Sequence, residues 1–411
     1  MMATQSQDAS YRVRAVHCDH QAGDEEVYEA LKRVTAPLDR AWERLRRANT
    51  ITVKFNQAFE PSRLVTIGGQ LQELVDYKVA RALLRLLREN TSAEIRCVEI
   101  STMAHHNEAL TPEETMTLLP VLREFDVPCI DGDLPPHKVY EVPGGGLMFR
   151  QYCLPESVGD TDAFISVQKI KNHAFMGVTL CLKNLFGLPP MEPHGRARQY
   201  FHHLVRLPYV LVDLGRIIQP TLNIIDALVG QSGREWGGEG RIGDALIAGD
   251  HVIATDAVGA HLMGHDPLGD WPDPPFRRDR NAIAIAHEDG FGTARLDAID
   301  YQSEVQAPLA SFDSVQTDPP ELVAAWRRST CEQALYYRDH RKQFVDRYAG
   351  EYILLQDNEV VWHDTQSELR RSRRELAGAR KESAMWLKLV DPDEAEGEHY
   401  EVYEKTLARL T

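Results

Sequence analysis

The stretch Phe164–Pro190 reads FISVQKIKNHAFMGVTLCLKNLFGLPP, and the rest of the expected fold is arranged around it. Its apolar start, Ala163–Val167, is typical of a buried strand in a parallel sheet. Four polar residues follow this run closely: Lys169, Lys171, Asn172 and His173. We therefore expect a strand whose carboxyl end presents several cationic and hydrogen-bonding side chains at one place.

A helix is predicted to begin near Gly177, because apolar residues recur at helical spacing from Val178 to Leu185. Gly187 and the two prolines after it predict its end. Three polar residues lie off the apolar face: Thr179, Lys183 and Asn184. Lysines beside the free amides of a helix N-terminus, at the carboxyl end of a strand, indicate an anion site. The alternative is that these lysines are ordinary solvated side chains.

Strand-like and helix-like segments alternate through the first two thirds of the chain at the spacing of βαβ units. The pattern predicts an α/β fold with doubly wound, mostly parallel sheets in two halves and a small appended C-terminal α+β module. We place the halves at residues 1–157 and 158–349, the second carrying the K-x-K-N-H loop. The expected strands are residues 11–17, 51–55, 94–100, 127–130, 163–167 and 221–228, and the expected helices are 25–48, 75–89, 111–125, 209–217 and 252–263.

The appended module is residues 350–411. A hairpin is expected over 352–362, around Asp357 and Asn358. Helices are expected over 365–390 and 400–410. We assign this module to packing or to assembly, including the formation of a homo-oligomer.

Charge and composition restrict the class of partner. A net charge of −16 disfavours nonspecific binding to nucleic acid or to an anionic membrane. No apolar run has the length of a membrane span, and no leader pattern is present. The six cysteines show no zinc or iron–sulfur spacing. We expect a cytoplasmic protein that places positive charge locally to hold a small anion.

Two further segments lie near the expected pocket. Residues 230–243 are rich in glycine but lack both the P-loop Lys-Ser/Thr and the G-x-G-x-x-G spacing, so we expect no Walker or Rossmann nucleotide site. Their glycines would let the backbone approach a ligand or move as a flap. Residues 192–203 contain several arginines and histidines, including His202 and His203. A cationic lid, an oligomer contact and a solvated loop all remain open for this segment.

The candidate site residues gather at predicted strand ends. Crowding raises the cost of each ammonium charge, so one lysine is expected to have a lowered pKa and to act as a base near neutrality. The other lysines would hold a carboxylate or phosphate and stabilise an enolate-like transition state. The catalytic candidates are Lys171, His173 and Lys183, and the substrate-binding candidates are Lys54, Asn56, Lys169, Asn172, Thr179, Asn184, Asp226, Gly230 and Asp256.

Asp256 lies among apolar and small residues of a predicted helix. A carboxylate in such a setting is normally paired, and Lys183 or Lys169 is the expected partner. The alternative is that Asp256 only anchors backbone near the start of a helix.

The central motif, K-x-K-N-H-x-x-x-G-V-T-L-x-L-K-N-x-F-G, resembles the signature of the uncharacterised family catalogued as domain of unknown function 362. The similarity continues through residues 220–230 and 249–267, and weakly at 53–56. The resemblance implies a fold more readily than a reaction. Many members of that family carry ferredoxin-type cysteine clusters, and this chain has none, so no iron–sulfur cluster is expected.

The segment H-x-x-x-x-T-P-E-E, which starts at His106, is similar to a strand-end histidine segment of the lactate racemase family. That family uses a nickel pincer nucleotide and acts on 2-hydroxy acids. The resemblance implies that His105 or His106 is an acid/base residue, and it assigns no lysine to a cofactor. A further hypothesis is a divalent metal site without that nucleotide. Its mixed nitrogen and oxygen ligands would be Glu99, His105, His106 and His173.

The sequence therefore favours an enzyme that binds a small carboxylate or phosphate and transfers a proton, as an isomerase, racemase or lyase, with or without a metal. Two alternatives stay open. One is a non-catalytic module that binds an anion or a metal and acts through a partner. The other is a redox enzyme that uses a bound organic cofactor.

Overall fold

The main body of the protein is built on one sheet. The computed structural model describes residues 10–101, 109–191, 200–366 and 373–410. The strands of this sheet are β1 (Arg12–His17), β2 (Thr50–Phe55), β5 (Glu94–Glu99), β6 (Cys129–Asp131), β9 (Ala163–His173), β10 (Gly177–Thr179), β11 (Leu222–Ser232), β12 (Glu239–Gly249) and β13 (Asp300–Ser303).

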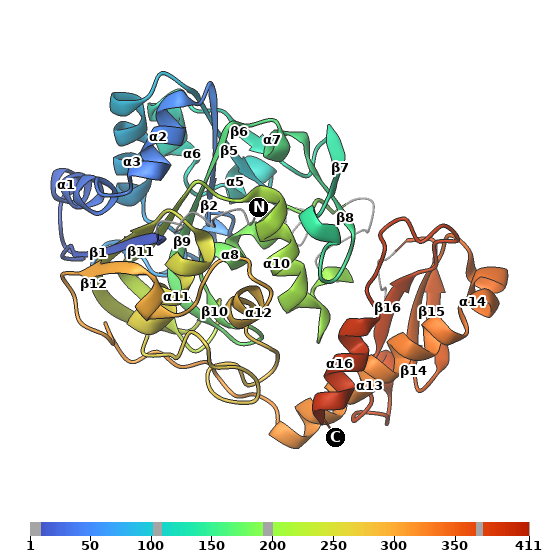
Figure 1. The fold of residues 1–411 in the computed structure, drawn as a ribbon. Coiled ribbons are helices and arrows are strands. Elements are labelled where there is room, and N and C mark those ends of the chain that lie inside the picture. The colour runs from blue at the N-terminus through green and yellow to red at the C-terminus, as the bar shows by residue number, and fades with distance from the viewer. Residues whose placement is uncertain (1–9, 102–108, 192–199, 367–372, 411) are drawn as a thin grey trace, which may run out of the picture.

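The nine strands follow the order β13-β1-β12-β11-β9-β2-β5-β6, with β10 paired to β9 (Figure 1). From β11 to β6 every neighbouring pair is parallel, and β12 runs antiparallel to both of its neighbours. The predicted α/β class with a mostly parallel sheet is confirmed. Because β9 lies between β11 and β2, both predicted halves contribute strands to this sheet.

Helices cover both faces of the sheet, as expected of a doubly wound fold (Figure 1). The strands β9 and β11 are buried along their whole length, which fits central strands that are covered on both sides. The helices that share a core with one face are α1 (Asp24–Thr35), α2 (Asp39–Arg47), α3 (Tyr77–Asn90) and α6 (Leu119–Glu124). Those on the other face are α8 (Cys181–Asn184), α10 (Arg206–Ile218), α11 (Val252–Leu262) and α12 (Ala282–Glu288).

No helix in the described parts of the chain is long and apolar enough to cross a membrane.

Short elements complete the main body. The short strands are β3 (Thr66–Ile67), β4 (Gln70–Leu71), β7 (His137–Glu141) and β8 (Gln151–Pro155), and the short helices are α5 (Pro112–Thr115) and α7 (Glu156–Gly159).

The segment that follows the apolar start of β9 differs from the prediction. The strand does not end near Val167 but continues to His173, so its lysines are strand residues. The chain then turns back, and β10 pairs with the end of β9. The predicted long helix is wrong, because only the four residues of α8 and a 3₁₀ turn over Leu185–Gly187 are helical.

The turn between β9 and β10 has a clear physical cause. Nδ1 of His173 accepts the backbone N–H groups of Phe175 and Met176, at 3.0 and 3.2 Å. Gly177 has a φ of 76°, which residues with a side chain rarely adopt. A histidine cap and a glycine in the left-handed region together reverse the chain where helical periodicity predicted a helix.

The C-terminal part forms a separate three-stranded antiparallel sheet, in which β14 (Tyr352–Gln356) lies between β15 (Glu359–Asp364) and β16 (Trp386–Leu389). The predicted hairpin is confirmed, and Asp357 and Asn358 at its tip have φ values of 52° and 65°. The helices are α13 (Pro320–Asp339), α14 (Arg341–Tyr348), α15 (Arg373–Ala377) and α16 (Glu401–Leu410).

The helix expected over 365–390 is wrong. In the described part of this range α15 is short, and β16 follows as a strand. Trp386 and Leu387 are buried in β16, which pairs with β14, so sheet packing decides the conformation there.

Four charged residues fasten this part to the main body, and we call Arg206, Lys388, Glu396 and Glu398 the junction cluster. Arg206 of α10 contacts Glu398 at 2.8 Å, and the ammonium of Lys388 also lies 2.8 Å from Glu398. Lys388 forms a second ion pair with Glu396. All four side chains are buried or nearly so, and the cluster holds two cations and two carboxylates.

Candidate functional site

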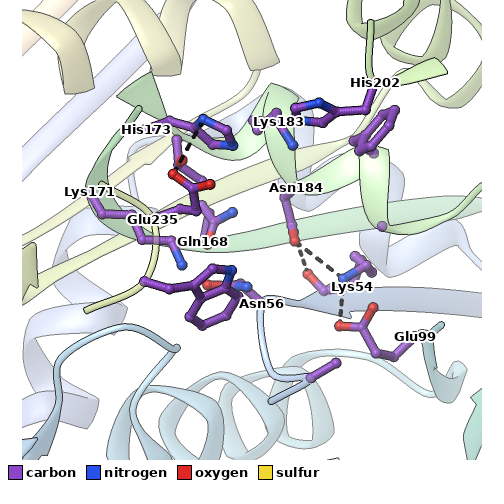
Figure 2. A pocket seen from close by; sticks show the side chains of 15 residues that line it. Lys54, Asn56, Glu99, Gln168, Lys171, His173, Lys183, Asn184, His202 and Glu235 are labelled. Carbon is purple, nitrogen blue, oxygen red and sulfur yellow. Dashed lines mark hydrogen bonds and ion pairs between the residues drawn. The ribbon is translucent and has the colours of Figure 1, made fainter. Parts of the chain in front are cut away.

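A cavity of about 350 Å³, called the first cavity below, lies at the carboxyl ends of β2, β5 and β9 (Figure 2). Parallel strands end at the same edge of a sheet, so residues far apart in sequence meet there. Eight predicted site residues line it: Lys54, Asn56, Glu99, Lys171, His173, Thr179, Lys183 and Asn184. The structure thus brings three lysines from two strands and one helix to a common recess.

Lys54 lines the first cavity at the end of β2. Its ammonium group donates to a carboxylate oxygen of Glu99 at 2.7 Å and to the side-chain oxygen of Asn184 at 3.3 Å. The amide of Asn184 in turn donates to the backbone oxygen of Lys54 at 3.0 Å. Because Lys54 is held by a carboxylate at direct contact, it is positioned as a fixed cation.

Lys171 lies near the end of β9 and is almost completely buried. Its ammonium group donates to the backbone oxygen of Glu73 at 2.7 Å and lies 4.3 Å from the centre of the Trp236 ring. Burial, helped by the charges of Lys169 and Lys54 and opposed by those of Glu73 and Glu235, lowers the pKa of Lys171 to about 8. Crowding was expected to lower the pKa of one lysine, but loss of solvation is the larger cause.

Two histidines face the same space (Figure 2). Burial, with a contribution from Lys183, holds the pKa of His173 and that of His202 well below the ordinary value. Both rings are therefore neutral near pH 7, and their centres are 6.0 Å apart. Because Nδ1 of His173 accepts backbone N–H groups, the proton of this neutral ring is on Nε2.

Two polar atoms of the first cavity have no hydrogen-bond partner among the described residues. They are the side-chain oxygen of Asn56 and the hydroxyl of Thr179, and both atoms are buried. Buried polar atoms are normally satisfied. A polar ligand in the first cavity would supply the missing partners.

Five predicted binding residues do not line the first cavity and instead hold its framework: Lys169, Asn172, Asp226, Gly230 and Asp256. Lys169 and Asp226 form a completely buried ion pair at 2.8 Å, linking β9 to β11. The amide of Asn172 donates to the backbone oxygen of Gly177 at 2.9 Å. At Gly230 a Cβ atom would lie 2.5 Å from Ile170, so glycine is required for close strand packing.

The expected anion site at the helix N-terminus is wrong, because Asp256 occupies it. Its carboxylate accepts the backbone N–H groups of Cys181 and Leu182 at 2.9 and 2.8 Å, which are the first amides of α8. The predicted pairing with Lys183 or Lys169 is wrong, and the backbone-anchor alternative is correct. The amides that we expected to bind a ligand are occupied by the protein's own carboxylate.

The metal-binding prediction falls partly outside the described residues, where His105 and His106 lie. Glu99, the third candidate ligand, is bound to Lys54 and also accepts the backbone N–H of Ile100 at 3.0 Å. In the described part of the chain, one group of three side chains lies close enough to share a metal ion, and it consists of Asp19, His20 and Asp244. None of these three lines the first cavity.

Several lining residues were not named as candidates from the sequence. Glu235 and Trp236 come from the glycine-rich segment. Its glycines, which would let the backbone approach a ligand, were the only feature of the sequence that indicated a role at the site. His202 belongs to the segment 192–203, for which a cationic lid was one of three alternatives. The remaining two polar or aromatic residues, Gln168 and Phe186, carried no signal in the sequence.

Comparison with known proteins assigns a family to the central part of the chain. Residues 65–261 match the family model described as "Domain of unknown function (DUF362)". The chain carries a DUF362 domain. This domain includes Glu99, Lys171, His173, Lys183 and the loop with Glu235, whereas Lys54 precedes it.

Two further matches cover only part of the chain. The "Thylakoid-associated protein sll1697" of Synechocystis sp. (strain ATCC 27184 / PCC 6803 / Kazusa) is 28% identical over 160 residues, which are 36% of this chain and 46% of that protein. The chain thus spans about half the length of this curated relative. Among solved structures, the lactate racemase apoprotein from Thermoanaerobacterium thermosaccharolyticum matches with a TM-score of 0.38 and 12% identity, over 61% of this chain and 56% of that one.

Proposed function

We propose that this protein is an enzyme that binds a small anionic metabolite, a carboxylate or a phosphate, in the first cavity and transfers a proton, as an isomerase, racemase or lyase. One observation carries the proposal. Lys171, whose pKa is about 8, opens into the same recess as Lys54 and Lys183. Such a group exchanges its proton near physiological pH.

The charges that line the first cavity support the binding of an anion. Lys54 is fixed by Glu99, and the ammonium groups of Lys171 and Lys183 face the recess (Figure 2). Cations in a partly desolvated recess bind carboxylate or phosphate oxygens through charge-assisted hydrogen bonds. The unsatisfied Thr179 hydroxyl offers a further donor to the same ligand.

The lowered pKa of Lys171 supports a role in proton transfer. Its neutral amine accepts the proton of a C–H bond next to the bound carboxylate, and the electron pair of that bond moves onto the carboxylate as an enolate. The remaining ammonium groups and Nε2–H of His173 stabilise the developing charge. Return of the proton gives an isomer, and loss of a leaving group from the neighbouring carbon gives a lyase product.

The direct test measures exchange of that C–H proton with solvent. The protein is incubated in D₂O with a panel of small carboxylates, and proton NMR follows the loss of the signal next to the carboxylate. We expect exchange for at least one acid, and Lys171→Met should slow it by about a hundredfold or more. The exposed Lys342→Met serves as the matched control and should leave the rate unchanged.

Two results would contradict this function. If carboxylates bind in the first cavity and none exchanges a proton, the protein is a non-catalytic anion-binding module. If exchange occurs equally in the Lys171→Met variant, the reaction does not depend on this lysine.

A further inference from the structure

A second cavity, of about 230 Å³, lies at the opposite end of the sheet from the first. The first cavity lies where β9 ends, whereas the second lies where β11 begins and β12 ends, beside the N-terminus of α11. The proposed reaction uses none of its residues. Six lining residues carry the argument: Tyr11, Arg40, Arg44, Thr221, His251 and Phe291.

Aromatic rings form one wall of the second cavity. The rings of Tyr11 and His251 have centres 4.1 Å apart with an angle of 30° between their planes, and Phe291 lies 5.3 Å from His251. Nδ1 of His251 accepts the backbone N–H of Ile253 at 3.3 Å, which orients the ring. Burial and the nearby Arg40 lower the pKa of His251 to about 4, so the ring is neutral. A flat and largely apolar ligand suits such a wall.

One cation at the second cavity, Arg44, has no carboxylate at direct ion-pair distance among the described residues. The charge of Arg40 is matched by Asp250, whose carboxylate accepts its Nε–H at 3.0 Å. The Nε–H of the exposed Arg44 instead donates to the backbone oxygen of Asp162 at 2.9 Å. The charge of Arg44 helps to lower the pKa of the Asp162 carboxyl group, but no direct ion pair joins the two side chains. A guanidinium group in this situation is suited to a carboxylate ligand.

A buried hydroxyl points to the same ligand. Thr221 is only 6% exposed, and its Oγ1 has no hydrogen-bond partner within the described parts of the chain. Its backbone N–H is satisfied by the oxygen of Phe164 at 2.7 Å, so the unmatched group is the hydroxyl alone. Unpaired buried hydroxyls are uncommon in folded proteins. A ligand oxygen in the second cavity would supply the partner.

We propose that the second cavity binds a small aromatic carboxylate, with its ring against Tyr11 and Phe291 and its carboxylate held by Arg44 and the hydroxyl of Thr221. The volume selects the size of the ligand. Pockets for drug-sized ligands span roughly 300–1,000 Å³, so 230 Å³ suits an acid with a single ring and is too small for a nucleotide.

The test is a calorimetric titration of the full chain with benzoate. Arg44→Met should weaken binding about tenfold or more, because a charge-assisted hydrogen bond is lost. Thr221→Val, which keeps the shape of the side chain, should weaken it about threefold to tenfold. Arg47→Met is the matched control on the same helix, since Arg47 is exposed and pairs with Glu43, and it should leave the affinity unchanged. Benzyl alcohol, which lacks the carboxylate, should bind at least tenfold more weakly than benzoate.

A variant of the first cavity separates this inference from the proposed function. Lys171→Met should abolish proton exchange and leave the affinity for benzoate unchanged. If benzoate binding is lost in Lys171→Met and retained in Arg44→Met, the acid binds in the first cavity and the inference is overturned. The absence of saturable benzoate binding would overturn it as well.

Discussion

The junction cluster and the first cavity contain the same residue types in two different arrangements. In the junction cluster each cation touches a carboxylate directly, Arg206 through Glu398 and Lys388 through both Glu396 and Glu398. In the first cavity Lys54 is held in this way, by Glu99, whereas Lys171 donates to a backbone oxygen and lies over an aromatic ring.

The pKa values of Lys388 and Lys171 are consequently shifted in opposite directions. Burial acts to lower the pKa of Lys388, but Glu396 and Glu398 raise it well above the ordinary value. Burial also lowers the pKa of Lys171, and the more distant Glu73 and Glu235 do not restore it, so it remains near 8. Direct contact with a carboxylate, more than burial itself, separates a structural cation from a candidate base.

The largest effect is expected from the junction cluster. Glu398→Gln leaves Arg206 and Lys388 with a single carboxylate and should lower the free energy of unfolding by about 3–5 kcal/mol, measured by urea denaturation. The exposed Glu401→Gln is the control and should change it little. A Glu398→Gln protein of unchanged stability would show that the cluster is not a structural fastening.

Asp256 is a buried carboxylate whose partners are backbone amides, and it can be compared with the buried ammonium group of Lys171. Asp256→Ala leaves the N–H groups of Cys181 and Leu182 without acceptors and should lower the free energy of unfolding by about 2–3 kcal/mol. Because α8 carries Lys183, anion affinity should fall as well. Full stability in the variant would contradict the anchoring role.

Asp256 also predicts a pH dependence. Burial raises its pKa from 3.8 to about 7, against the effect of the two amides. The folded state therefore holds this proton more tightly than the unfolded state, and stability should fall as the pH rises from about 4 to about 7. Urea denaturation across this range should show the fall in the wild type, and Asp256→Ala should lose that component.

Lys171 should affect ligand binding more than stability. Lys171→Met removes a charge that is costly to bury, so the free energy of unfolding should stay constant or rise slightly. Affinity at pH 7 for the carboxylate whose proton is exchanged in the first cavity should fall about tenfold, equivalent to about 1.4 kcal/mol. The wild-type affinity should also weaken as the pH rises through about 8, and the variant should lack this dependence.

The smallest effect concerns Glu235. This carboxylate raises the pKa of Lys171, so Glu235→Gln should move the titration of Lys171 to lower pH. NMR titration of the lysine side chain would detect the change. An upward movement would contradict the account of how the pKa of Lys171 is set.

The sequence predicted the parts of this structure that depend on strand periodicity. Lys54 and Lys171 were expected at one edge because parallel strands end together, and both line the first cavity. Lys169 was predicted to bind the substrate, but it does not line the first cavity. It forms a buried ion pair with Asp226 of β11, a contact between strands that sequence patterns do not reveal.

The remaining site residues depend on tertiary structure. The helix predicted from Gly177 was replaced by a hairpin, because the side chain of His173 caps a turn that apolar spacing does not encode. Glu235 and Trp236 reach the first cavity through a loop whose conformation depends on contacts such as that between Gly237 and Glu73. Such contacts join segments far apart in the chain, so local patterns could not place them.

The central claim is that Lys171 is a poised base in an anion-binding recess. It is tested most directly by following the ¹³Cε NMR signal of Lys171 against pH, assigned with Lys171→Met, with and without a bound small carboxylate. We predict a midpoint near pH 8 in the free protein and a higher midpoint with the anion bound. A midpoint at the ordinary lysine value of about 10.5, unchanged by the anion, would contradict the account.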